Sequence, residues 1–146
     1  MPEPTTPPVS SPEPPIRVVA VAVRDADGRF LTVRKRGTTA FMQPGGKPEP
    51  GETPEQTGVR EIREELGAEV ADVARLGEWT APAANEHGRT IEAVVLTARL
   101  VSLTGPQAEI EELMWWDPAD ASVPADRIAP LLRDVVAPTL ADVPPS

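Results

Sequence analysis

The chain contains no cysteine and no tyrosine, and it has only 14 lysines and arginines against 23 aspartates and glutamates. The absence of cysteine excludes disulfides, thiol nucleophiles and thiolate metal sites within this sequence. The net charge of -9 argues against a broad surface for nucleic-acid polymers or anionic lipid. No apolar run approaches the roughly 20 residues that a membrane-spanning helix needs. We therefore expect a cytoplasmic protein with neither a nucleic-acid polymer nor a membrane as its partner.

The length and the distribution of proline indicate one domain with loose ends. Hydrophobic residues make up 40% of the 146 residues, which is enough for a single core. The N-terminal stretch "MPEPTTPPVSSPEPP" holds seven of the 19 prolines and lacks the basic and apolar regions of a signal peptide. We expect a disordered tail over residues 1–15, one folded domain over 16–138 and a flexible C-terminal tail over 139–146.

Apolar and β-branched stretches predict a mixed sheet. The segment "IRVVAVAVRD" is almost continuously apolar, which is typical of a strand buried on both faces. A turn at "DADG" leads to "RFLTVRKR", which we expect to be its partner strand. Residues 68–83 and 89–101 indicate a meander, "EELMWWD" a short last strand, and "RIAPLLRDVV" a C-terminal helix. These elements predict an α/β (α+β) fold with a mixed sheet between helices.

The clearest helix is predicted from Thr53 to Gly67, after a Gly- and Pro-rich loop long enough to be functional. Thr53 as N-cap, Pro54 at the first helical position and Gln56 form a capping box. Apolar residues at helical spacing form a core face: Val59, Ile62 and Leu66. Roughly opposite, we place an acidic face: Glu61, Glu64 and Glu65.

The acidic face sets three like charges at i, i+3 and i+4, which repel one another by a few tenths of a kcal/mol per pair. A bound cation would offset this repulsion. Mg2+ prefers carboxylate oxygens and is often shared with substrate phosphates. The three acids therefore predict a metal site that admits a polyphosphate, which an acidic protein otherwise repels.

The loop and helix together resemble the signature of the Nudix hydrolases, GX5EX7REUXEEXGU, in which U is an aliphatic residue. The signature covers 23 of the 146 residues, and its fixed positions match in register: Gly46, Glu52, Arg60, Glu61, Glu64, Glu65 and Gly67. Ile62 and Ala68 fill the U positions, the second with a small side chain. The chain is thus similar to a single-domain, MutT-like member of this family.

This resemblance implies an α/β/α sandwich and an enzyme that hydrolyses the pyrophosphate bridge of a nucleoside diphosphate linked to another moiety. It also implies Mg2+ or Mn2+ as cofactor, with one of the acids as the base that activates water. The implied metal ligands are three carboxylates and one backbone carbonyl: Glu61, Glu64, Glu65 and Gly45. Arg60 completes the implied catalytic set, and together with Glu52 it would orient the carboxylates.

Residues outside the acidic face are candidates for contacts with the substrate. Lys47 and Gly46 lie in the signature loop, and Arg34 lies in a basic strand end, so each is a candidate for binding phosphate. Phe41, like the three tryptophans, is either a stacking surface for a base or a core residue. Because family members differ in which acid is the base, further candidates lie outside the signature: Glu86, Glu109, Glu111 and Glu112.

The substrate remains open at this level. The compact size is similar to the branch that acts on nucleoside triphosphates, including oxidised ones. An ADP-ribose type of substrate is the alternative, because Pro82 lies near the spacing typical of ADP-ribose hydrolases without matching it. A regulatory module that binds a nucleotide without catalysis is a rival function, although the complete set of glutamates argues against it. Family members are often dimers, so a homodimer is also expected.

Overall fold

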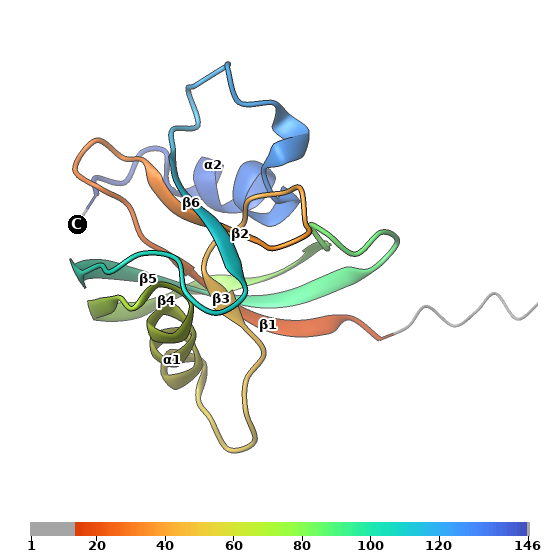
Figure 1. Ribbon diagram of the computed structural model, residues 1–146, viewed down its shortest axis with the longest axis vertical. Coiled ribbons are helices and arrows are strands. Elements are labelled where there is room, and N and C mark those ends of the chain that lie inside the picture. Colours follow the sequence, from red (N-terminus) through yellow and green to blue (C-terminus); the bar gives the residue numbers. More distant parts are fainter. Residues whose placement is uncertain (1–13, 146) are drawn as a thin grey trace, which may run out of the picture.

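The computed structural model describes residues 14–145 and has two sheets with helices on opposite sides (Figure 1). The larger sheet has the order β3-β1-β5-β4, and it is mixed because β1 runs parallel to β5 and antiparallel to β3. The smaller sheet pairs β2 with β6. The strands are β1 (Ile16–Ala22), β2 (Phe30–Lys35), β3 (Gly45–Gly46), β4 (Glu69–Pro82), β5 (Thr90–Ser102) and β6 (Ile110–Trp116). The helical segments are α1 (Pro54–Leu66), η1 (Ala125–Arg127), η2 (Leu131–Val136) and α2 (Ala137–Leu140).

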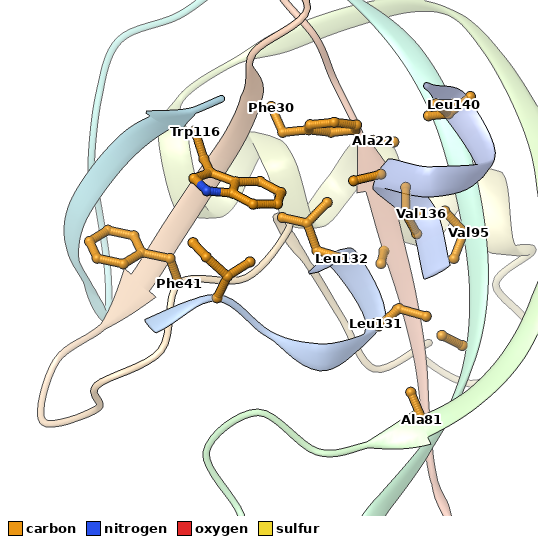
Figure 2. Packing of buried hydrophobic residues seen from close by; sticks show 14 residues of the cluster. Ala22, Phe30, Phe41, Ala81, Val95, Trp116, Leu131, Leu132, Val136 and Leu140 are labelled. Atoms are coloured by element: carbon orange, nitrogen blue, oxygen red, sulfur yellow. The ribbon is translucent and has the colours of Figure 1, made fainter. Parts of the chain in front are cut away.

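Both faces of β1 are buried, as its apolar run predicts. Val19 belongs to a cluster of buried residues that includes Ile62 of α1. Its neighbour Ala20 belongs to a second cluster, which includes Leu132 of η2 and is drawn in Figure 2. Because successive side chains of a strand point to opposite faces, α1 covers one face of the sheet and the η2–α2 segment covers the other. The mixed sheet and the α/β/α layering expected for this chain are confirmed.

Helix α1 begins and ends where the sequence predicts. The Thr53 hydroxyl accepts a hydrogen bond from the backbone N–H of Gln56, and the side-chain oxygen of Gln56 accepts one from the backbone N–H of Thr53. Gly67 ends the helix in the left-handed conformation, with φ of 56°, which glycine adopts without steric cost. A Cβ at Gly58 would lie 2.7 Å from the Leu96 side chain, so this glycine lets α1 approach the sheet closely.

Three predicted features of the topology require correction. The ladder partner of β2 is β6 rather than β1, with Phe30 opposite Trp116. The long loop is interrupted by β3, whose two glycines pair with β1. The C-terminal helix is a π-type turn that continues as the short α2.

The two expected tails have different outcomes. The expectation for residues 1–13 lies outside the described residues. The domain boundary expected at residue 138 falls inside α2, and Leu140 is only 3% exposed, so the packed chain extends beyond that boundary. Within residues 14–145, no helix is both long enough and apolar enough to cross a bilayer.

Candidate active site

A cleft of about 520 Å3 lies between β1, the signature loop, α1 and the start of η2. Its apolar lining comes from one end of the larger sheet and from η2: Ile16, Val18, Pro82, Ala83, Ile91 and Leu131. Its polar part is made of the signature loop, α1 and the end of β2: Lys35, Gly45, Gly46, Lys47, Arg60 and Glu61. This combination of apolar walls and a few grouped polar side chains is typical of a small-molecule site.

The glycines of β3 bring the signature loop directly against α1 and β1. A Cβ at Gly45 would lie 2.0 Å from the carbonyl oxygen of Val19, and one at Gly46 would lie 2.5 Å from Cδ of Glu61. No side chain fits at either position without moving its neighbours. The Gly45 amide donates a hydrogen bond to Oε1 of Glu65 at 3.1 Å. These contacts hold the loop backbone beside two carboxylates of α1.

The three helix acids do not share one exposed face, which corrects the expected acidic face opposite the core. Glu65 is buried, with 3% of its surface exposed. The Glu61 side chain is 16% exposed and the Glu64 side chain is 55% exposed. Glu65 precedes the core residue Leu66 and is covered by the loop, so it lies at the border between the core and the cleft.

Burial of the carboxylates leaves them short of positive charge. Desolvation raises the pKa of Glu65 to about 8, and the nearby charges of Glu61 and Glu109 act in the same direction. The Gly45 amide and the charge of Lys35 offset this rise only in part. Burial also raises the pKa of Glu61. A cation beside these two carboxylates would favour their charged forms.

The Arg60 guanidinium connects the acids of the signature. It donates to Glu52 at 2.6 and 2.9 Å, to Glu61 at 2.7 Å and to Glu64 at 3.2 Å. Its hydrogen bond to Glu52 is the main cause that lowers the pKa of that carboxyl to about 2. Arg60 also donates to the Lys47 carbonyl at 3.1 Å. The arginine therefore ties the loop to the helix and compensates part of the negative charge.

The donors present suit a hard divalent cation, although they are not gathered into a ligand cage. Among residues 14–145, no three His, Cys, Asp or Glu side chains lie together as a ready metal site. The fit rests on the chemistry of the donors. Glu65 and Glu61 are carboxylates beside the Gly45 backbone, and burial raises the pKa of both despite the positive charges nearby. Arg60 contacts Oε1 of Glu61 and Oε2 of Glu64, so the second oxygen of each carboxylate could bind an ion while Arg60 stays in place.

The structure separates the predicted phosphate contacts. Lys47 and Gly46 line the cleft. Arg34 does not line it, because its guanidinium pairs with Glu112 and donates to the Thr38 carbonyl at 2.8 Å. Lys35, the next residue of β2, lines the cleft instead, and its charge lowers the pKa of both Glu61 and Glu65. Alternation along the strand explains why the two neighbours differ.

Phe41 is a core residue and presents no free face to a base. It is 4% exposed and lies below the guanidinium groups of Arg34 and Arg127, at 5.9 and 5.7 Å from its ring centre. The candidate stacking role of Phe41 therefore requires correction, while the alternative of core packing holds. Trp116 is buried as well, in the same cluster.

Of the four extra carboxylates, two are brought to the cleft and two are not. Glu86 and Glu109 line it. Glu109 lies 3.3 Å from the Lys35 ammonium group, and its charge reaches Glu65. Glu111 and Glu112 pair instead with arginines of the strand end, Arg36 and Arg34.

Gln43 is a residue of the cleft that the sequence did not reveal. It lines the cleft, is 6% exposed, and has no hydrogen-bond partner for either atom of its side-chain amide. The only signal in the sequence is a polar residue directly before the Pro-Gly-Gly of the loop, and this signal says nothing about burial.

Comparison with known proteins places these features in context. A family model described as the NUDIX domain matches residues 14–137. The chain is 32% identical over 122 residues to an uncharacterised Nudix hydrolase from Rhodococcus erythropolis, which covers 68% of this chain and 62% of that protein. It is 46% identical over 59 residues to an RNA pyrophosphohydrolase from Halorhodospira halophila, covering 40% of this chain and 33% of that protein. The chain thus spans 33% and 62% of these relatives' lengths.

A solved structure extends the comparison to the whole fold. A pyrophosphohydrolase from Bacillus subtilis superposes with a TM-score of 0.63 at 26% identity, and the match covers 92% of this chain and 82% of that chain. The similarity therefore includes the sheet, α1 and the C-terminal helical segment as well as the signature.

Proposed function

Since this chain belongs to the Nudix family, we propose that it is an enzyme that hydrolyses the pyrophosphate bridge of a nucleoside diphosphate linked to another moiety. One observation carries the proposal: the buried Glu65 and the half-buried Glu61 lie against the glycine loop, and Glu61, Gly45 and Gly46 line the polar part of the cleft. Burying carboxylates there carries a desolvation cost, and a cation shared with a polyphosphate would offset that cost.

Each residue of the polar part has a proposed task. Glu61, Glu64, Glu65 and the Gly45 carbonyl would hold Mg2+ or Mn2+. The ion, when bound, neutralises phosphate charge and lowers the pKa of water. Lys35 and Lys47 would bind the terminal phosphates. Glu52 and Arg60 would hold the helix acids in place through the hydrogen bonds already present.

The proton of the attacking water needs an acceptor close to the polar part. Glu64, Glu86 and Glu109 are the carboxylates left for this role, because Glu111 and Glu112 are paired with arginines outside the cleft. General bases of this kind contribute roughly 10^2- to 10^4-fold to the rate. Separate Gln variants of Glu64, Glu86 and Glu109 would distinguish them through the loss of turnover.

A nucleoside triphosphate is the proposed substrate, including an oxidised one, with ADP-ribose as the alternative. The cleft volume of about 520 Å3 lies within the range of about 300–1,000 Å3 that is usual for small-molecule sites. A triphosphate at the 5′ end of RNA is a second candidate, favoured by the similarity to the H. halophila protein. The net charge of -9 opposes extended contact with an RNA chain.

The test is a substrate screen of the full chain with Mg2+ or Mn2+, with products identified by mass spectrometry. It would include nucleoside triphosphates, oxidised dGTP, ADP-ribose and RNA with a 5′-triphosphate. We expect a nucleoside monophosphate or a shortened nucleotide to appear only with the metal present. Nucleotide binding by calorimetry without any product would instead support the regulatory module. A cytoplasmic location and a homodimer remain predictions, to be checked by fractionation and by light scattering.

A further inference from the structure

Among the described residues that line the cleft, Gln43 is the buried side chain with an unused hydrogen-bonding group. Its Nε2 and Oε1 atoms are both buried without a partner, and the residue as a whole is 6% exposed. An unpaired buried amide is less stable than one whose hydrogen bonds are satisfied. A leucine of similar size would avoid that cost in these surroundings. Because Gln43 lines the cleft, this unpaired donor and acceptor indicate a ligand that pairs with both once the side chain turns toward the cleft.

The backbone around Gln43 is held firmly against the apolar part of the cleft. The Ala129 amide donates to the Phe41 carbonyl at 2.8 Å, so the start of η2 lies next to this segment. On the other side, the Ala40 amide donates to the Asn85 side chain at 3.0 Å. Ala129 and Asn85 both line the cleft. Gln43 thus follows a segment whose backbone is held on both sides by residues of the cleft.

The position of Gln43 relative to the phosphate site indicates which part of a substrate it would meet. It precedes Gly45 by two residues, and two extended residues span at most about 7 Å. The group that Gln43 meets is therefore the one attached to the phosphate chain, near the polar part and enclosed by apolar side chains such as Leu131. A flat heterocycle with polar edges fits this combination.

We propose that Gln43 is a specificity-determining residue, whose primary amide exchanges two hydrogen bonds with a neighbouring donor and acceptor on the edge of the substrate's nucleobase. This inference rests on the proposed function and deepens it, since it predicts a preference for base-containing polyphosphates over base-free ones. A glutamine amide makes this paired contact with adenine at N6 and N7, and other bases offer similar edges.

The decisive measurement is kcat/KM of the wild type, Gln43→Leu and Gln43→Glu for ATP, GTP, CTP, UTP and the base-free tripolyphosphate. We expect the wild type to prefer one base, and Gln43→Leu to lower kcat/KM for it by roughly tenfold or more. In this variant kcat/KM for tripolyphosphate should not change, and the differences in kcat/KM among the four nucleotides should disappear. Gln43→Glu keeps the shape but loses the donor, so it should weaken the same base. Gln107→Leu is the matched control, since Gln107 is exposed and lies outside the cleft.

A structural role for Gln43 predicts a different result. If the amide only binds an internal water, Gln43→Leu changes the unfolding temperature and affects all substrates equally, which would overturn the proposal. An unchanged ranking of bases would overturn it as well. If the wild type cleaves nothing, calorimetric binding of the same five ligands decides the point separately, because the hydrolase proposal then fails while base selection by Gln43 is still measured. Wild type that binds no nucleotide better than tripolyphosphate would end the inference.

Discussion

The amide of Gly45 donates a hydrogen bond to Oε1 of Glu65 at 3.1 Å, and this contact joins the signature loop to the buried acid of α1. It satisfies one lone pair of a carboxylate that has 3% of its surface exposed. Desolvation still raises the pKa of Glu65 to about 8. This hydrogen bond therefore links the position of the loop to the charge state of the Glu65 carboxyl.

Replacing a helix acid by its amide should remove turnover while the fold remains. We expect Glu64→Gln and Glu65→Gln each to lower kcat by at least roughly 10^2-fold, the lower end for positioned acid–base groups. The control is Glu69→Gln, whose exposed carboxylate pairs with Arg63 outside the cleft. Near-normal steady-state hydrolysis by both active-site variants would contradict the assignment of these acids.

Metal-free protein should lose stability as pH rises because of Glu65. The folded carboxyl has a pKa of about 8 against the ordinary 4.5, so between these values the folded state binds more protons than the unfolded state. The free energy of unfolding should therefore fall from about pH 4.5 to about pH 8, by on the order of a few kcal/mol. Chemical denaturation in EDTA measures this slope.

Glu65→Gln provides the comparison for that pH profile. The amide carries no charge, so the variant should be the more stable protein at pH 8 without metal, with little slope over the same range. Added Mg2+ should then stabilise the wild type more than the variant, since ligands stabilise the state that binds them. A wild-type profile as flat as that of the variant would show that Glu65 is not buried as a titrating acid.

The Arg60–Glu52 ion pair should matter for metal affinity more than for folding. Arg60→Lys keeps the charge but loses the forked contact that reaches Glu52, Glu61 and Glu64 together. We expect metal affinity to weaken by roughly 10- to 100-fold, as is typical when groups that orient ligands are changed. Mn2+ titration by calorimetry measures it, with Arg63→Lys as the control because Arg63 pairs only with the exposed Glu69.

Gly46→Ala tests the close approach of loop and helix. The added methyl group would lie 2.5 Å from Cδ of Glu61, so the carboxylate must move away from the cleft. We expect at least a roughly tenfold loss of kcat/KM, since small displacements of catalytic groups are costly. Circular dichroism should report an unchanged fold. Full activity with Mg2+ would mean that the position of Glu61 is not critical.

Local sequence determined helix α1 and, with it, the identity of the candidate site. Thr53, Pro54 and Gln56 begin the helix and Gly67 ends it, because capping depends on groups within a few residues of each other. The apolar run of β1 likewise predicts burial on both faces, since strand periodicity is local. The spacing of the glutamates and of Arg60 in the signature belongs to the same local level.

Only the tertiary structure decided what surrounds those groups. Helical spacing gives the angle of Glu65 around α1, but its burial depends on β3 packing against it. The choice of Lys35 over Arg34, and of Glu109 over Glu111, follows from the pairing of β2 with β6. The burial of Gln43 at the cleft and the missing partners of its amide appear only in the folded chain. Strand pairing and burial join residues far apart in the chain, so no short stretch of sequence contains them.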